Sequence, residues 1–246
     1  MLSTRIRIIL VLIIVLCNCL IYRENYENEE KDITVVICNY ARPDNVEKII
    51  KELINNSYID EIIVTHGKAE TYRDFEGAKN IKNYEINSKY GGTQRFFAAL
   101  ESSNEKIIFL DDDHIPSESL IMDMRKLSNE DPDQIYGPYK RRCLKTGYSY
   151  NSTKDNYNVI LTGLVMTSKN VVNSYMKNFD KYSETLEKTH GNGEDLTFNH
   201  SFIDNYGKKP YYIEGAKYEV LDDQSESYSG RPDHKEKRDF ICKKFF

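Results

Sequence analysis

The sequence of 246 residues lacks the short fingerprints that identify several large enzyme classes. It contains no G-x-S-x-G element, no P-loop and no G-x-G-x-x-G segment, so no motif indicates an α/β-hydrolase, a P-loop nucleotidase or a dinucleotide-binding enzyme. Zinc chemistry is not expected, because neither His114 nor His190 has a Cys or another His at ligand spacing. No internal repeat is evident, and the length suits one sizeable domain.

Extended positive charge is also lacking. The formal net charge is -5, and the strongest basic clusters, Lys140–Arg142 and Lys235–Arg238, are short. A protein dedicated to nucleic acid normally carries a basic face that follows the phosphate backbone. We therefore expect no nucleic-acid partner, and the two clusters suit at most a local anion.

One long apolar run is present, at residues 8–22. Arg5 and Arg7 precede the run, and the mainly acidic stretch 23–30 follows it. Positive charge before such a run and negative charge after it orient a signal-anchor with the N-terminus in the cytoplasm and the body in the lumen. About 15 residues is short against the usual ~20, although endoplasmic-reticulum bilayers are thinner than the plasma membrane. A cleaved signal peptide is the alternative, but no A-x-A-like site occurs, and Cys17-Asn-Cys19 is the nearest substitute.

This orientation divides the chain into a cytoplasmic tail at 1–7, a transmembrane signal-anchor at 8–22, a polar stem at 23–32 and a single body domain at 33–246. We expect a single-pass type II protein of the endoplasmic reticulum or Golgi membrane, with the body in the lumen. Sequons at Asn55, Asn151 and Asn199 are compatible with lumenal exposure, although such triplets arise often by chance in an Asn-rich chain.

Few cysteines are available for disulfides. Two of the five, Cys17 and Cys19, lie in the apolar run, which leaves Cys38, Cys143 and Cys242 in the body. An odd number cannot all pair within one chain. Cys38 follows a β-branched apolar pattern and is expected to be a buried free thiol.

The body alternates between strand and helix patterns. Short β-branched runs predict buried strands, and apolar residues at i, i+3, i+4 and i+7 predict helices. The order β-α-β, with helices too short for an independent bundle, predicts an α/β fold whose mostly parallel sheet is covered by helices on both faces. The expected strands are 33–38, 61–65, 106–110 and 158–166, the expected helices begin at Pro43, Thr93, Ser117 and Asp195, and residues 143–156 are expected to form a long surface loop.

Three consecutive acids, Asp111, Asp112 and Asp113, follow the strand predicted at 106–110. Acids at the carboxyl end of a strand lie where open α/β sheets place their ligand crevices. Like charges this close repel one another, and a divalent cation such as Mg²⁺ or Mn²⁺ would stabilise them. A solvated acidic loop is the alternative. In an extended chain Asp111 and Asp113 would share one side and Asp112 would face the other.

Several segments in fixed order resemble the exostosin-type glycosyltransferase domain, a family of retaining N-acetylhexosaminyltransferases with the GT-A fold. The resemblance covers roughly residues 33–242, and several motifs in order are more specific than any one alone. The matching segments are Asn39–Arg42, Gln94–Phe96, Leu110–Asp113, Asp131–Gly137, Val159–Gly163, Gly193–Asp195 with Phe198 and Asn199, and the C-terminal series Tyr228–Gly230, His234 and Arg238.

The resemblance implies transfer of a sugar from a UDP-sugar, such as UDP-N-acetylglucosamine or its galactosamine epimer, to a glycan or glycoprotein acceptor. It implies Mn²⁺, or else Mg²⁺, with Asp113 as the metal ligand. Asp111 and Asp112 would meet the ribose or a metal-bound water. Arg42 and Arg95 would supply fork-shaped donors for uridine or diphosphate oxygens. The alternative for both arginines is an ordinary surface position, and it is stronger for Arg95.

The second acidic pair carries the implied chemistry at the sugar. Asp195 would stabilise the oxocarbenium-like sugar, and Glu194 would contact sugar hydroxyls. Arg238, in a charge run otherwise read as solvated, would fold over the diphosphate in a mobile C-terminal lid. A plain helix-capping role for Glu194 and Asp195 is one alternative. An inverting transferase with either acid as general base, and a non-catalytic membrane-anchored binding protein of the same fold, are two others.

One position departs from the family pattern. Many relatives have a Cys directly before the second acidic pair, bonded to a Cys near the C-terminus, whereas this chain has Gly193 there. The resemblance therefore implies that Cys242 has lost its partner.

Overall fold

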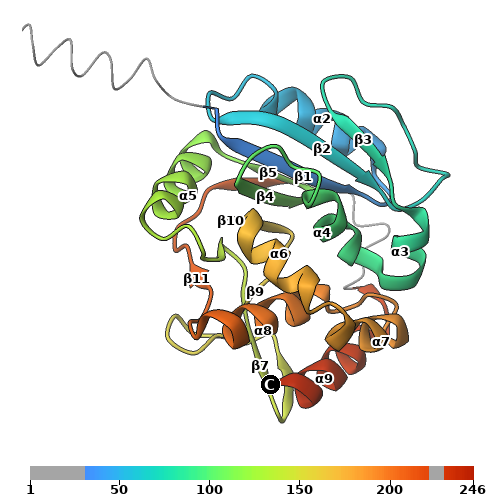
Figure 1. Ribbon diagram of the computed structural model, residues 1–246, viewed down its shortest axis with the longest axis vertical. Helices are drawn as coiled ribbons and strands as arrows, with labels where there is room; N and C mark the ends of the chain where they lie inside the picture. Colours follow the sequence, from blue (N-terminus) through green and yellow to red (C-terminus); the bar gives the residue numbers. More distant parts are fainter. Residues whose placement is uncertain (1–30, 222–229) are drawn as a thin grey trace, which may run out of the picture. The chain divides into compact units, whose positions relative to one another are not determined.

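The computed structural model of the chain describes residues 31–221 and 230–246 (Figure 1). The tail and the transmembrane anchor expected within 1–22 lie outside these residues, as do most of the stem and Tyr228. Within the described residues no helix has both the length and the apolar character needed to cross a bilayer. One compact unit, Asp32–Phe246, contains all the elements that follow.

The described residues form a central seven-stranded sheet in the order β11-β6-β10-β4-β1-β2-β3. β1, next to the central strand β4, pairs in parallel with β2 and β4, and β3 continues in parallel from β2. Only β10 runs antiparallel to its neighbours β4 and β6. The fold class is therefore confirmed as α/β with a mostly parallel sheet. The strands are β1 Ile33–Asn39, β2 Ile59–His66, β3 Lys79–Lys82, β4 Lys106–Asp111, β6 Tyr136–Gly137, β10 Leu164–Ser168 and β11 Tyr211–Tyr212.

Helices cover both faces of this sheet. Because side chains alternate along a strand, Val35 and Ile37 of β1 enter one core while Val36 enters the other. On the first side lie α2 (Pro43–Leu53) and α5 (Glu118–Glu130). On the second side lie α4 (Gln94–Ala99), α6 (Lys169–Lys177), α7 (Asp180–Lys188) and α8 (Glu194–Tyr206). The remaining elements are α3 Tyr84–Tyr90, η1 Gly91–Thr93, β5 His114–Pro116, β7 Lys140–Leu144, β8 Gly147–Ser149, β9 Val159–Ile160, β12 Tyr218–Val220 and α9 His234–Phe245.

Local patterns located most of the elements around the first acidic cluster. Pro43 opens α2, and the Ser117 hydroxyl accepts a hydrogen bond from the Leu120 amide at the start of α5, as expected of a cap. The prediction of a single strand at 158–166 was wrong. Two short strands form instead, β9 paired with β7 and β10 paired with β4, separated by Leu161–Gly163. The break lets Gly163 pass against Asp111, because a Cβ there would lie 2.6 Å from a carboxylate oxygen of Asp111.

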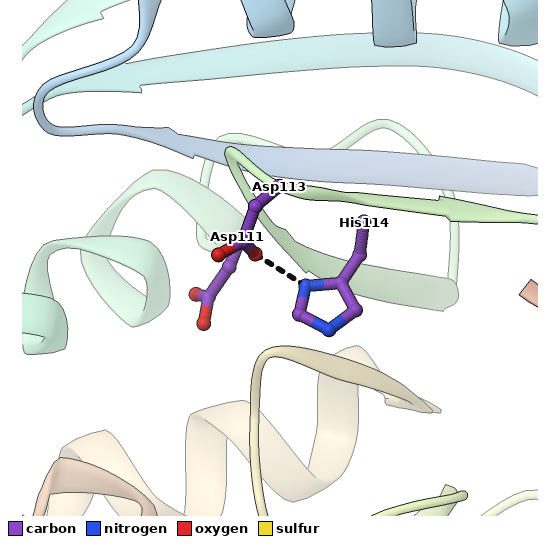
Figure 2. A group of neighbouring side chains, drawn as sticks. All are labelled: Asp111, Asp113 and His114. Atoms are coloured by element: carbon purple, nitrogen blue, oxygen red, sulfur yellow. Dashed lines mark ion pairs between the residues drawn. The ribbon is translucent and has the colours of Figure 1, made fainter. Parts of the chain in front are cut away.

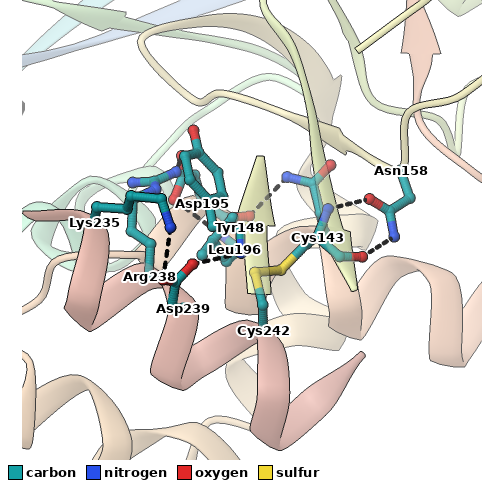
Figure 3. Close-up of a disulfide and its surroundings, with 10 residues drawn as sticks. Cys143, Tyr148, Asn158, Asp195, Leu196, Lys235, Arg238, Asp239 and Cys242 are labelled. Carbon is teal, nitrogen blue, oxygen red and sulfur yellow. Dashed lines mark hydrogen bonds and ion pairs between the residues drawn. A yellow bond between two sulfur atoms is a disulfide. The ribbon is translucent and has the colours of Figure 1, made fainter. Parts of the chain in front are cut away.

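Two further predictions were also wrong: that residues 143–156 form a long surface loop, and that Cys242 has lost its disulfide partner. The segment begins with a hairpin in which β7 pairs with β8, and Cys143 on β7 is bonded to Cys242 on α9 (Figure 3). Both cysteines are fully buried and lie 99 residues apart in sequence. No local pattern indicates a bond of this span. Cys38 is the buried free thiol that its strand pattern predicted.

Candidate functional site

The eight residues singled out in the sequence line one cavity of about 370 Å³ at the carboxyl ends of β1 and β4. They come from the end of β4 and the segment after it, from the segment after β1, from α4, from the start of α8 and from α9. The structure thus brings together residues from five parts of the chain. They are Arg42, Arg95, Asp111, Asp112, Asp113, Glu194, Asp195 and Arg238.

Asp112 binds the segment that follows β1. Its Oδ1 accepts a hydrogen bond of 2.6 Å from Arg42, and its Oδ2 accepts bonds of 3.2 Å from the amides of Tyr40 and Ala41. Burial raises the pKa of Asp112 above its ordinary value, although the Arg42 charge opposes the rise. Arg42 also reaches Asp113 at 3.2 Å. In this structure Asp112 therefore shapes the cavity wall, and it holds Arg42 next to the other acids.

Arg95 is buried, which excludes the surface position considered for it. It is 4% exposed, and its guanidinium donates to Asp111 at 2.6 Å and to the carbonyls of Thr162 at 2.6 Å and Gly92 at 3.1 Å. Burial alone would raise the pKa of Asp111, but the Arg95 charge, with smaller help from other cations nearby, holds this pKa below its ordinary value. Asp111 is therefore a stable carboxylate with one oxygen taken by arginine.

Asp111, Asp113 and His114 form a group that could hold a metal ion. One ligand atom of each lies within 4.8 Å of the others, and Figure 2 shows the two carboxylates and the ring converging between the end of β4 and the start of β5. The Asp113 Oδ1 lies 2.5 Å from the His114 Nδ1. Asp111 and Asp113 belong to this group while Asp112 turns to Arg42. The extended chain assumed in the sequence analysis ends at Asp111, and residues 112 and 113 form a turn, so strand alternation is not the cause. Two carboxylates and an imidazole nitrogen fit a divalent cation.

The second acidic pair begins α8 on the other side of the cavity. Gly193, at φ 112°, leads into the helix with a left-handed backbone that suits glycine. Asp195 is 4% exposed, and its two oxygens accept from the Leu196 amide at 2.8 Å and from Arg238 at 2.5 Å. Burial and the Asp195 charge raise the pKa of Glu194 to about 7. A capping role does not account for this buried pairing.

The charge run around Arg238 was expected to be solvated, with Arg238 itself as the exception. The run forms α9, and Arg238 lies on its buried side at 5% exposure. Its guanidinium carbon lies 4.5 Å from the Tyr148 ring centroid while its Nη2 donates to Asp195 (Figure 3). Polar neighbours such as Lys235 and Lys237 hid this buried face in the sequence. His234, at the start of α9, is buried as well.

A comparison with protein families decides the class of protein. The family model described as the glycosyl transferase family 64 domain matches residues 33–246. The chain belongs to this family. It is therefore a glycosyltransferase, an enzyme that transfers a sugar from a donor to a glycan acceptor. Membership of this family suggests a nucleotide-sugar as the donor. A search of curated proteins found no match.

Two residues of this family 64 chain escaped the sequence-based assignment. Thr162 joins the two acidic groups, because its carbonyl accepts from Arg95 and its hydroxyl donates to Glu194 at 3.3 Å. The only signal was its place in the motif Val159–Gly163. His114 directly follows the acid triplet. The sequence analysis considered it only as a zinc ligand, which requires a Cys or another His at ligand spacing, whereas its neighbours in the possible metal site are aspartates.

Proposed function

We propose that the chain transfers an N-acetylhexosamine from a UDP-sugar to a glycan or glycoprotein acceptor with retention of configuration, in a reaction that depends on Mn²⁺ or Mg²⁺. The supporting observation is the meeting of Asp111–Asp113 and Glu194–Asp195 in one cavity together with three buried arginines. Such a cavity has anionic groups for a cation and a developing sugar cation, and cationic groups for phosphate oxygens.

The metal has one task in this proposal. A divalent ion held by Asp113 supplies positive charge that offsets the charge gained by the leaving diphosphate. The arginines are already buried and oriented by carboxylates, so they lose little conformational freedom when phosphate oxygens approach. Arg238 lies between Asp195 and Tyr148, from where it can meet the diphosphate edge without a large rearrangement.

Retention is supported by the family resemblance and by the position of Asp195. Its carboxylate is fixed by the Leu196 amide and by Arg238, which suits a residue that stabilises positive charge on the sugar. One observation favours the inverting alternative. The pKa of Glu194, about 7, is the value a general base needs near neutral pH. The anomeric configuration of the first product, read by NMR, separates the two.

The compartment is part of the proposal. The apolar run at 8–22 and its flanking charges support a type II anchor in the endoplasmic reticulum or Golgi membrane. The Cys143–Cys242 bond supports a lumenal position for the domain, because disulfides persist in oxidising compartments and are rare in the cytosol.

The decisive experiment measures UDP release from a panel of UDP-sugars with and without Mn²⁺. We expect Asp113→Asn to reduce release by about 100-fold or more, because a stabilising interaction in the transition state is lost. Asp123→Asn, an exposed acid on α5, is the matched control and should leave release unchanged. Release that survives Asp113→Asn would remove Asp113 from its role. Mn²⁺-dependent UDP binding without release from any UDP-sugar would favour the non-catalytic binding protein.

A further inference from the structure

The His114 ring is fixed on its outer side. Its Nε2 lies 2.7 Å from the Tyr139 hydroxyl, and the two rings meet edge to face at 5.3 Å. Tyr139 in turn packs against Tyr218 at 5.2 Å. His114 belongs to β5, which pairs with β12 through His114 and Val220. Backbone and side-chain contacts therefore hold the ring in one orientation at the edge of the cavity.

The inner nitrogen of the same ring faces the acids. Its Nδ1 lies 2.5 Å from the Asp113 Oδ1, a contact that is an ion pair when the ring is protonated. Within residues 31–221 and 230–246 neither of these two buried atoms meets the geometry of a full hydrogen bond. When Nε2–H donates to Tyr139, Nδ1 presents a lone pair to a carboxylate oxygen. Two electron-rich atoms facing each other are unfavourable alone, but they suit a cation that both can bind.

We propose that His114 is a direct ligand of the divalent ion through Nδ1, beside Asp113 and Asp111, and that it shifts the preference of the site from Mg²⁺ toward Mn²⁺ and Co²⁺. The inference rests on the metal dependence in the proposed function. Mg²⁺ prefers water and other oxygen ligands. A site with an imidazole nitrogen binds first-row transition-metal ions more tightly than Mg²⁺, and among these it binds Co²⁺ more tightly than Mn²⁺. Tyr139 is a positioning residue that fixes which nitrogen carries the proton.

Pulsed EPR on Mn²⁺ bound to the full-length chain tests the ligation directly. A coordinated imidazole gives ¹⁴N modulation, and labelling with ¹⁵N-histidine must change it. We expect this signal in the wild type and its loss in His114→Asn. His190→Asn is the matched control, because His190 is exposed and its φ of 52° is one that Asn tolerates. It should keep the signal.

Calorimetric titration with Co²⁺ and with Mg²⁺, each in the presence of UDP, tests the preference. His114→Asn should lower the ratio of Co²⁺ to Mg²⁺ affinity by about 10-fold or more, since an oxygen ligand replaces nitrogen. Tyr139→Phe should weaken Co²⁺ binding by roughly 10-fold while the ¹⁴N signal persists.

The outcomes separate this inference from the proposed function. A wild type that binds Mn²⁺ with UDP but shows no histidine modulation overturns His114 ligation and leaves the proposed function standing. A wild type that binds neither Mn²⁺ nor Co²⁺ in the presence of UDP contradicts both. Because a missing histidine signal in the labelled wild type is enough to overturn the inference, the test stays decisive even if His114→Asn does not fold.

Discussion

Glu194 is the residue at which burial and charge most directly affect both stability and chemistry. Its carboxyl lies between Asp195, Arg95 and Thr162, and a Cβ at Gly92 would come 2.8 Å from its Oε1. The Asp195 charge and burial disfavour its ionised form and raise its pKa to about 7. The folded chain therefore holds this proton more tightly than the unfolded chain does, which links folding to pH.

This linkage fixes the direction in which the free energy of unfolding changes with pH. Below the ordinary pKa of 4.5 the group is protonated in both states and has no effect, and as the pH rises to about 7 its ionisation progressively destabilises the fold. Glu194→Gln, which cannot ionise, should be more stable than wild type at pH 8 by on the order of 2 kcal/mol and nearly equal at pH 4. Urea unfolding without divalent ions or UDP measures this difference. An equal difference at both pH values would show that the carboxyl is not the cause.

The structure also shows what the motifs could not state about single residues. Position in a motif was enough to place Arg42, Arg95 and Asp112 at the cavity. It did not show that Asp112 pairs with Arg42 or that Asp111 pairs with Arg95. The first two residues are 70 positions apart in sequence and the second two are 16 apart, so no local pattern indicates either pairing. The sequence therefore predicted which residues line the cavity but not which of them form ion pairs with one another.

At the scale of elements, contacts of three kinds hold α9 to the β7–β8 hairpin: a hydrogen bond, a cation–ring contact and a disulfide. The Tyr148 amide donates to Asp239 at 2.7 Å, the Tyr148 ring lies against Arg238, and Cys242 is bonded to Cys143. Cys242 lies one helical turn beyond Arg238, so both face the hairpin side of α9. The disulfide therefore helps to keep Arg238 opposite Asp195.

Loss of this disulfide should affect both stability and transfer. A bond that closes a loop of 99 residues contributes roughly 2–4 kcal/mol. We expect the double variant Cys143→Ser with Cys242→Ser to lose stability of that size, measured by urea unfolding. UDP release should fall because Arg238 is less well fixed. Dithiothreitol should reproduce both losses in the wild type and have no further effect on the double variant. A wild type whose fully reduced form keeps its rate would show that the bond does not position Arg238.

Elements were predictable where their apolar residues are local and periodic. Every residue of β1 is buried, and α2 buries one face through Val46, Ile49, Ile50 and Leu53. The pattern fails for α9, whose buried face consists of His234, Arg238, Ile241 and Cys242. Two of these four are polar and are stabilised by distant partners, so hydrophobic periodicity gives no signal. The hairpin of β7 and β8 was not predicted either, because it too lacks a periodic apolar pattern.

At the scale of the whole molecule, the three sequons test the proposed orientation in the membrane. Asn55 and Asn151 are exposed. Asn199 is fully buried, and its amide donates to the backbone carbonyls of Ile160 at 2.8 Å and Asp195 at 2.7 Å. If the domain lies in the lumen, we expect glycans at Asn55 and Asn151 only, because a glycan at Asn199 is incompatible with this fold.

Expression in a eukaryotic cell followed by glycosidase digestion measures the number of glycans by the change in mobility. Asn55→Gln and Asn151→Gln should each remove one glycan. Asn199→Gln should remove none but should lower stability by about 1–3 kcal/mol, because backbone groups of Ile160 lose their buried partners. Deletion of residues 1–22 is the control for translocation and should abolish both glycans. A chain without any glycan would contradict the lumenal orientation, whereas a folded chain carrying three would contradict the buried position of Asn199.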